Sequence, residues 1–390
     1  IQLDEVWPDH PDPADPHRKV DPWCECERCA ASSREGKLRE HILWLTQMLT
    51  SKGVGKVVMW NAQLTRHMKG LDGPFVERLK SAGLQDRLIL HWWWYDNHKL
   101  NESVHVKLGK DLGLRGWVAP MTCDYNWDHL DLRRENISIM LRMGLSEGAE
   151  GAVSYAVHDP GWLDHEALLA SYAWNGDGAE TVTGLRDRWI HSRFRGRAPV
   201  FKEAQDALEK AGTAYPSLHA CNYYNYTYSG DKPPFPRPYP GEALVKLSGQ
   251  DAGKLKDELA GAAAEAHAAA QAFAGLCRSP GDLSGDELAC ARSLLAEAAR
   301  IEGLATSFTY LSGAWRAVQQ NQVSDELLPS CEKARETLLE SMALVEANKP
   351  AWLAPSCLQG LSVLLEFLEQ LGSDLARVRS GQWAPEAVRW

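Results

Sequence analysis

Two adjacent carboxylates, Asp4 and Glu5, stand in the opening stretch "IQLDEVW". Neighbouring side chains of a strand point to opposite faces, so both can act on one substrate only where the strand ends. Cleavage of a glycoside needs a carboxylic acid that protonates the leaving oxygen and a second group that stabilises the oxocarbenium ion. Asp4 and Glu5 are therefore the catalytic candidates, and a solvated surface pair is the alternative.

Tryptophan is unusually frequent, with 16 residues, and 12 of them fall within the first 200 positions. Flat aromatic side chains stack on the apolar faces of sugar rings at low entropic cost. The candidate substrate-binding residues are Trp7, Trp60, Trp93, Trp94, Asp124, Tyr125, Tyr155, His158, Asp159 and Trp162. Trp92 and Trp117 belong to the same aromatic group, although core packing can explain any single member. For His158, and likewise for His91, a hydrogen-bonded structural or sugar-binding role competes with proton relay.

Three cysteines, Cys24, Cys26 and Cys29, lie together in "WCECERC". Structural zinc takes four Cys or His ligands, so these thiolates predict a possible zinc site with His10 or His17 as the fourth ligand. The alternative is a set of thiols, or a disulfide, that stiffens a long loop. The total of nine cysteines is odd and shows no framework spacing, which favours reduced thiols. No other cofactor is predicted.

The candidate catalytic and substrate-binding side chains stand at the ends of short apolar runs, which must position them. These runs alternate with amphipathic helical stretches, which is the rhythm of βα units. With the opening stretch, five such units are predicted, the others being "KVVMWNAQL" (56–64), "RLILHWWWYDNH" (87–98), "RGWVAPMTCDYNW" (115–127) and "EGAVSYAVHDPGW" (150–162). In a parallel barrel, residues at the carboxyl ends of strands face the substrate. We therefore expect an α/β fold in which residues 1–177 form the second half of a (β/α)8 TIM barrel, about strands 4 to 8. A Rossmann-like open sheet is the alternative, but no Gly-rich phosphate loop follows these runs.

The composition changes after this part of the chain. Residues 178–240 are expected to be a linker that carries a loop rich in Tyr and Pro. Residues 241–390 are expected to form an all-α bundle of about four helices, because Leu361, Leu364, Leu368 and Leu371 recur at helical spacing.

Several of these motifs resemble glycoside hydrolase family 20, the β-N-acetylhexosaminidases. "IQLDEVW" looks like the segment that ends the family's fourth barrel strand, and "VVMWNAQL" looks like its tryptophan-bearing strand. "GAVSYAVHDPGW" resembles its eighth strand, and "HEALLASYAWN" resembles the helix that closes the barrel. The resemblance covers about residues 1–175 and implies a retaining, exo-acting, substrate-assisted enzyme.

The resemblance also implies roles for individual residues. Glu5 would be the general acid/base, and Asp4 would orient the 2-acetamido group that attacks the anomeric carbon. Trp60 and Trp162 would wall the sugar. The implied hydrogen-bonding partners of the sugar are Asp124, Tyr125 and Asp159.

The charge balance bears on the partner. The net charge is −10 and the pI is near 5.7, which argues against nucleic acid as a partner, because phosphate binding needs clustered Lys and Arg. The sequence has no apolar run of membrane-spanning length, so no membrane partner is expected. Ile1 is not a natural start, and we expect a fragment that lacks the first strands of the barrel. Its compartment and oligomeric state are left open.

Two other functions are compatible with the same sequence. One is a carbohydrate-binding barrel that has lost turnover but keeps its aromatic rim. The other is a glycosidase of a related barrel family that acts on uronic or neutral sugars. The paired carboxylates favour an enzyme over a binding protein.

Overall fold

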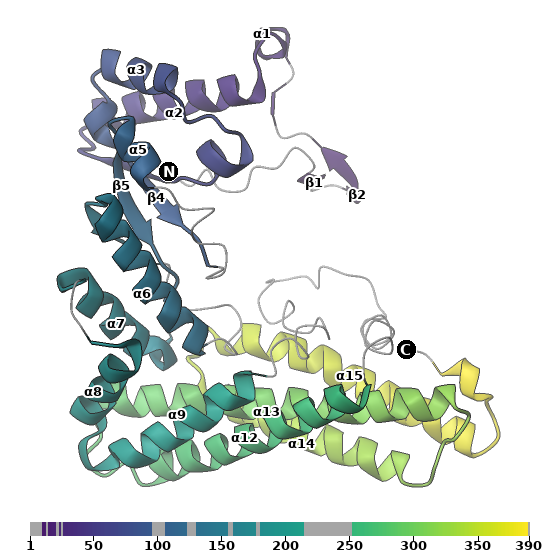
Figure 1. Cartoon of the computed structure of the whole chain (residues 1–390). Helices are drawn as coiled ribbons and strands as arrows, with labels where there is room; N and C mark the ends of the chain where they lie inside the picture. The colour runs from purple at the N-terminus through teal and green to yellow at the C-terminus, as the bar shows by residue number, and fades with distance from the viewer. Residues whose placement is uncertain are drawn as a thin grey trace. The chain divides into compact units, whose positions relative to one another are not determined.

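The fold is described from a computed structural model of residues 1–390 (Figure 1). The structure describes residues 10–12, 15–20, 23–24, 26–95, 106–122, 130–154, 159–176, 180–213 and 252–388. By its internal contacts the chain divides into two compact units. The first unit comprises Ile1–Thr122, Leu132–Ala156 and Leu168–Glu180; the second comprises Cys123–Asp131, Val157–Ala167 and Thr181–Trp390.

The amino-terminal elements include all the described strands. In chain order they are β1 (His10–Asp12), β2 (Asp15–Val20), α1 (Glu27–Ala30), α2 (Arg34–Ser51), β3 (Val57–Trp60), the π-helix η1 (Gln63–His67), α3 (Gly73–Ser81), η2 (Gln85–Arg87), β4 (Leu88–Trp93), α5 (Val106–Asp111), β5 (Arg115–Ala119), α6 (Leu130–Glu147) and β6 (Gly151–Ala152). Strands β1 and β2 form an antiparallel pair. Strands β3 to β6 form a parallel sheet in sequential order.

Side-chain alternation gives this sheet two different faces. Trp92 and Val118 are buried on one face, where α5 and α6 approach closely. A Cβ atom at Gly109 of α5 would come within 3.0 Å of the Trp92 ring, and one at Gly144 of α6 would meet Val118 at 2.5 Å. The opposite face carries partly exposed side chains, so the strands place helices on one side and the aromatic row described below on the other.

The four strands coincide with four of the predicted βα units. The strands are parallel and follow one another in sequence order, and α5 and α6 cover the same face of the sheet. Strands and helices of a (β/α)8 barrel are arranged in the same way. The described residues nevertheless form an open sheet of four strands, so half of a TIM barrel is not confirmed. What the structure does show is a mixed α/β chain with a parallel sheet and a helical carboxyl-terminal region.

Helices make up the rest of the described chain. They are η5 (Pro160–Trp162), α7 (Leu163–Trp174), α8 (Val182–Phe194), η6 (Arg195–Arg197), α9 (Ala198–Gly212), α12 (Ala252–Arg278), α13 (Gly285–Gln319), α14 (Leu327–Asn348), α15 (Ala354–Arg379) and η8 (Pro385–Ala387). In the second unit, α9, α12, α13 and α14 run alongside one another (Figure 1). The predicted stripe on α15 is its core face, because all its leucines at the predicted positions are fully buried.

Two helices, α8 and α9, occupy part of the segment for which a linker was expected. The sequence of α9 explains this difference, since Phe201, Ala204, Leu208 and Ala211 recur at helical spacing and are all buried. The remainder of that segment, from residue 214 to 240, lies outside the described residues.

Side-chain caps stand at the start of α2 and α13, whereas α14 and α15 begin without one. At α13, the Ser284 hydroxyl accepts from the backbone of Glu287 at 3.3 Å, and the Glu287 carboxylate accepts from the backbone of Ser284 at 2.7 Å. This capping box fixes where α13 begins.

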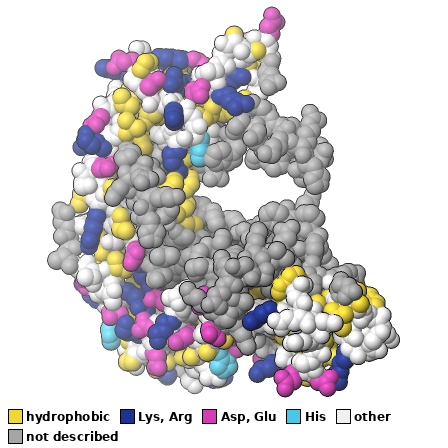
Figure 2. Space-filling view, turned by 45° about the vertical axis from the view of Figure 1, so that its right-hand side comes forward, with side chains coloured by type: hydrophobic (Ala, Val, Ile, Leu, Met, Phe, Trp, Pro, Cys, Tyr) yellow, Lys and Arg dark blue, Asp and Glu magenta, His cyan; other side chains and the backbone are white. Residues whose placement is uncertain are grey.

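The outer surface mixes both signs of charge. Figure 2 shows Lys and Arg side chains interspersed with Asp and Glu over the face in view. In the part of the chain that the structure describes, none of the helices combines the length and apolar character needed to cross a bilayer.

Candidate functional site

Three aromatic side chains line up across adjacent strands of the parallel sheet. Trp60, His91 and Trp117 occupy in-register positions of β3, β4 and β5. The His91 ring meets Trp60 edge to face at 5.4 Å between ring centroids and stacks on Trp117 at 5.4 Å with an interplanar angle of 20°. All three are partly exposed. We call Trp60, His91 and Trp117 the aromatic row.

The next position along the row is Gly151 of β6, which pairs with Trp117. A Cβ atom at this glycine would lie 3.3 Å from the Trp117 indole nitrogen, so any side chain there would press on the ring. The glycine therefore leaves that edge of Trp117 uncovered by its strand neighbour.

Burial sets the protonation state of His91. It lowers the pKa of the imidazole from 6.5 to about 4, so the ring is neutral near pH 7. Its Nε2 atom is buried and has no hydrogen-bond partner among the described residues. The row thus offers a neutral imidazole between two indoles, and the exposed parts of these rings can stack on a ligand.

A second aromatic group, Trp93, Trp94 and Tyr95, lies at the carboxyl end of β4. The Arg66 guanidinium lies over both the Trp93 ring, at 4.2 Å, and the Trp94 ring, at 4.4 Å. Tyr95 packs beside Trp93 with ring centroids 4.8 Å apart. Such stacking fixes the orientation of the indoles. The indole nitrogens of Trp93 and Trp94 are buried without partners among the described residues.

Two buried amides hold these strand ends in place. The Asn61 side-chain oxygen Oδ1 accepts from the backbone N–H of Trp93 at 3.4 Å, which ties the end of β3 to β4. The Asn136 side chain, on α6, donates to the Trp94 carbonyl at 2.8 Å and accepts from the Met121 backbone at 3.2 Å.

Asn61, Asn136 and Arg66 are not among the residues predicted from the sequence. The position of Asn61 directly after a strand is the one local signal that could have pointed to it. Arg66 and Asn136 carry no comparable signal, because their partners lie far away along the chain.

Asp159 and Trp162 belong to the second unit, whereas the aromatic row belongs to the first. The Asp159 carboxylate accepts from the Gly161 backbone at 2.9 Å, from the Lys349 ammonium at 2.9 Å and from the Ser293 hydroxyl. Trp162 is 1% exposed and packs against His165. Both side chains are buried, so neither presents a group to a ligand.

Trp92, which the sequence grouped with the rim aromatics, is 1% exposed on the helix-covered face of the sheet. Strand alternation is the reason, since Trp92 must point away from its neighbours His91 and Trp93. The remaining candidates lie outside the described residues; they are Asp4, Glu5, Trp7, Asp124, Tyr125, Tyr155 and His158.

The structure places the three predicted cysteines close together. The Sγ atoms of Cys24, Cys26 and Cys29 all lie within 4.8 Å of one another. Hydrogen bonds with the thiols of Cys26 and Cys24 raise the pKa of Cys29 above its ordinary value. These residues could hold a metal ion, and the strands that carry His10 and His17 precede them in the chain.

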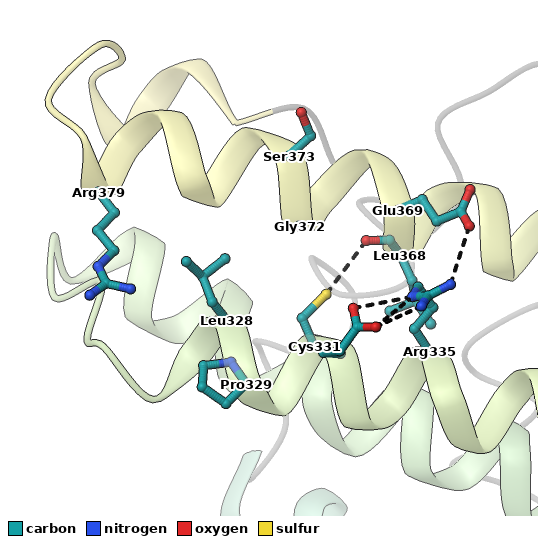
Figure 3. Close-up of a pocket in the computed structure, with 10 residues that line it drawn as sticks. Leu328, Pro329, Cys331, Arg335, Leu368, Glu369, Gly372, Ser373 and Arg379 are labelled. Atoms are coloured by element: carbon teal, nitrogen blue, oxygen red, sulfur yellow. Dashed lines mark hydrogen bonds and ion pairs between the residues drawn. The ribbon is translucent and has the colours of Figure 1, made fainter.

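A further hollow lies between α14 and α15 (Figure 3). It has a volume of about 610 Å³ and two arginines in its lining. Arg335 donates to Glu332 at 2.6 Å, and Arg379 pairs with Asp325 at 3.0 Å. Both positive charges are matched by the protein's own carboxylates, so the hollow gives no specific indication of a charged ligand.

Comparisons with known proteins leave the family open. No protein-family model matches the chain, and no curated protein matches it. Among solved structures, the chain is similar to a GH138 enzyme targeting pectin rhamnogalacturonan II, with 12% sequence identity and a TM-score of 0.45. The match covers 89% of this chain and 53% of the other, so the chain spans about half the length of that enzyme. This similarity is too distant to assign an activity, and the resemblance to glycoside hydrolase family 20 gains no support from it.

Proposed function

We propose that the aromatic row binds a carbohydrate and that the protein is a glycoside hydrolase. The observation that carries the proposal is the in-register placement of Trp60, His91 and Trp117 on the partly exposed face of the sheet. Neighbouring strands are about 4.8 Å apart, so three in-register rings extend over about 10 Å, which is comparable with a disaccharide.

Core packing alone does not explain this group well. The row keeps some exposure, whereas the other face of the same sheet buries Trp92 and Val118 almost completely. The apolar face of a sugar ring can stack on the partly exposed indoles of Trp60 and Trp117.

For the chemistry, we propose Glu5 as the general acid/base and Asp4 as the residue that orients and stabilises the reacting group. This assignment rests on the two adjacent carboxylates in the sequence. The finer proposal is substrate-assisted, retaining cleavage of β-N-acetylhexosaminides, and it rests on the sequence resemblance alone.

Hydrolysis of three aryl glycosides by the protein tests the activity: the N-acetyl-β-glucosaminide, the β-glucuronide and the β-glucoside. Cleavage of the N-acetyl-β-glucosaminide to a product that retains the anomeric configuration supports the finer proposal. Cleavage of the β-glucuronide or the β-glucoside supports a related glycosidase. Glu5→Gln should slow substrates with poor leaving groups about 10²- to 10⁴-fold, because only these need a donated proton. Normal turnover by Glu5→Gln on such substrates would refute the catalytic assignment.

Binding is tested separately, by calorimetric titration with oligosaccharides of the same three sugars. Trp60→Ala and Trp117→Ala should each weaken binding about tenfold or more, equivalent to about 1.4 kcal/mol. Trp352→Ala is the matched control, because Trp352 is 57% exposed and belongs to the second unit. Binding that depends on the row, without hydrolysis of any substrate, would instead favour a non-catalytic carbohydrate-binding protein.

A further inference from the structure

The three cysteines that precede α2 form a cluster whose assembly needs an explanation beyond burial. Cys24 and Cys26 are exposed, and Cys29 is partly exposed. Exposed thiols gain little by packing on one another, so the hydrophobic effect does not account for their convergence.

The local backbone produces the convergence. Cys26 is the N-cap of α1, and its carbonyl accepts from the backbone of Cys29 at 2.8 Å and of Ala30 at 2.8 Å. This single turn brings Cys29 back toward Cys26. On the other side, the Lys37 ammonium donates to the Cys24 carbonyl at 2.8 Å, which fastens Cys24 to the first turns of α2.

The sulfur positions suit one small cation. When three atoms lie within 4.8 Å of one another, a point exists that is no farther than about 2.8 Å from each, and zinc–thiolate bonds are about 2.3 Å long. A contraction of about 0.5 Å at each sulfur therefore completes a three-thiolate site. One disulfide, by contrast, would use only two of the three thiols.

We propose that Cys24, Cys26 and Cys29 bind one Zn²⁺ ion through three thiolates. Thiolates are soft ligands that select zinc over magnesium and calcium, and tetrahedral zinc leaves one position for water or a further protein ligand. Bound zinc would link the segment before α1 to α1 itself and so stiffen this part of the first unit. This role is independent of the proposed glycosidase activity.

The test uses the complete chain, reduced and stripped of metal with a chelator. Anaerobic titration with Co²⁺ should give one equivalent of thiolate-to-cobalt charge-transfer absorption, which Zn²⁺ then displaces. Replacement of any one of the three cysteines by serine should reduce this absorption and weaken binding at least about 100-fold, more than the loss typical of outer-shell changes. Cys277→Ser is the control, since Cys277 is a partly exposed thiol on α12 outside the cluster and should leave the titration unchanged.

Alkylation mapped by mass spectrometry provides a second readout on the unmodified sequence. Zn²⁺ should protect all three thiols of the cluster and leave Cys277 reactive. The proposal is overturned if the triple serine variant binds Co²⁺ as the parent does, or if the reduced parent binds no ion. It is also overturned if, on exposure to air, two of the three thiols are oxidised by oxygen to a disulfide although Zn²⁺ is present in excess.

Discussion

Replacement of Lys349 by methionine should destabilise the helical unit strongly. The Lys349 ammonium and the Asp159 carboxylate have no exposed side-chain surface and lie 2.9 Å apart, and the ammonium also donates to the Ser293 hydroxyl at 2.9 Å. Methionine fills most of the same space but leaves the Asp159 charge buried without its cation. Breaking a buried ion pair in this way costs about 3–5 kcal/mol.

The lower end of that range is expected. Asp159 keeps its hydrogen bonds from the Gly161 backbone and the Ser293 hydroxyl, and these still stabilise a negative charge. A loss of about 3 kcal/mol corresponds to a decrease in Tm of about 6–12 °C for a unit of roughly 200 residues.

The assay is thermal and urea unfolding followed by far-ultraviolet circular dichroism, with a double-mutant cycle. Asp159→Asn removes the charge and keeps an acceptor for Gly161, so the Asp159→Asn/Lys349→Met pair should be more stable than Lys349→Met alone. Lys333→Met is the matched control on α14, the helix whose C-cap is Lys349, since Lys333 is exposed and should change stability by less than about 0.5 kcal/mol. A loss below about 1 kcal/mol for Lys349→Met, or no recovery in the double variant, would refute the assignment of a coupled buried pair.

Three further outcomes are expected in the first unit. Burial lowers the pKa of His91 to about 4, so the folded state disfavours protonation of the ring. The free energy of unfolding should therefore fall by about 1–2 kcal/mol as the pH drops from 6.5 toward 4, after allowance for partial solvent screening. In urea titrations His91→Phe should flatten this pH dependence, and an unchanged dependence would contradict the reasoning. Gly144→Ala should cost about 1–3 kcal/mol because its Cβ would meet Val118 at 2.5 Å, whereas Gly261→Ala on α12, with nothing within 4 Å, should be neutral or stabilising in the same melts. Asn136→Ala should cost about 1–3 kcal/mol because the two backbone groups that it pairs stay buried, and a wild-type melting curve would show that other groups replace it.

Local patterns predicted some of the regular elements, but α8 and α9 lie where a linker was expected. The apolar runs that gave β3, β4 and β5 are buried strands, because alternate residues of each run pack under helices. The leucine spacing of α15 likewise matches its buried stripe, since both the helical period and the core face can be read from one short segment.

The site could be predicted only in part. Trp60 and Trp93 were found because they directly follow apolar runs, and the structure places them on the same face of neighbouring strands. Asn136, 42 residues from its partner Trp94, has no local signal, because a polar residue within a helix is normally solvated. Asp159 appeared to be a rim residue from its position after a strand, but its partner Lys349 is 190 residues away. Interactions over such separations depend on tertiary packing, which periodicity does not encode.

The central helix α13 has a consequence for how the second unit folds. Residues 293–301 are all buried, which covers every side of the helix over more than two turns, and α9, α12, α14 and α15 all contact it. A helix without a solvated face gains its stability from its neighbours, so it cannot persist after they separate. The amide hydrogens of its middle turns should therefore exchange with solvent only through global opening of the unit, and the surrounding helices should unfold with it in one cooperative step.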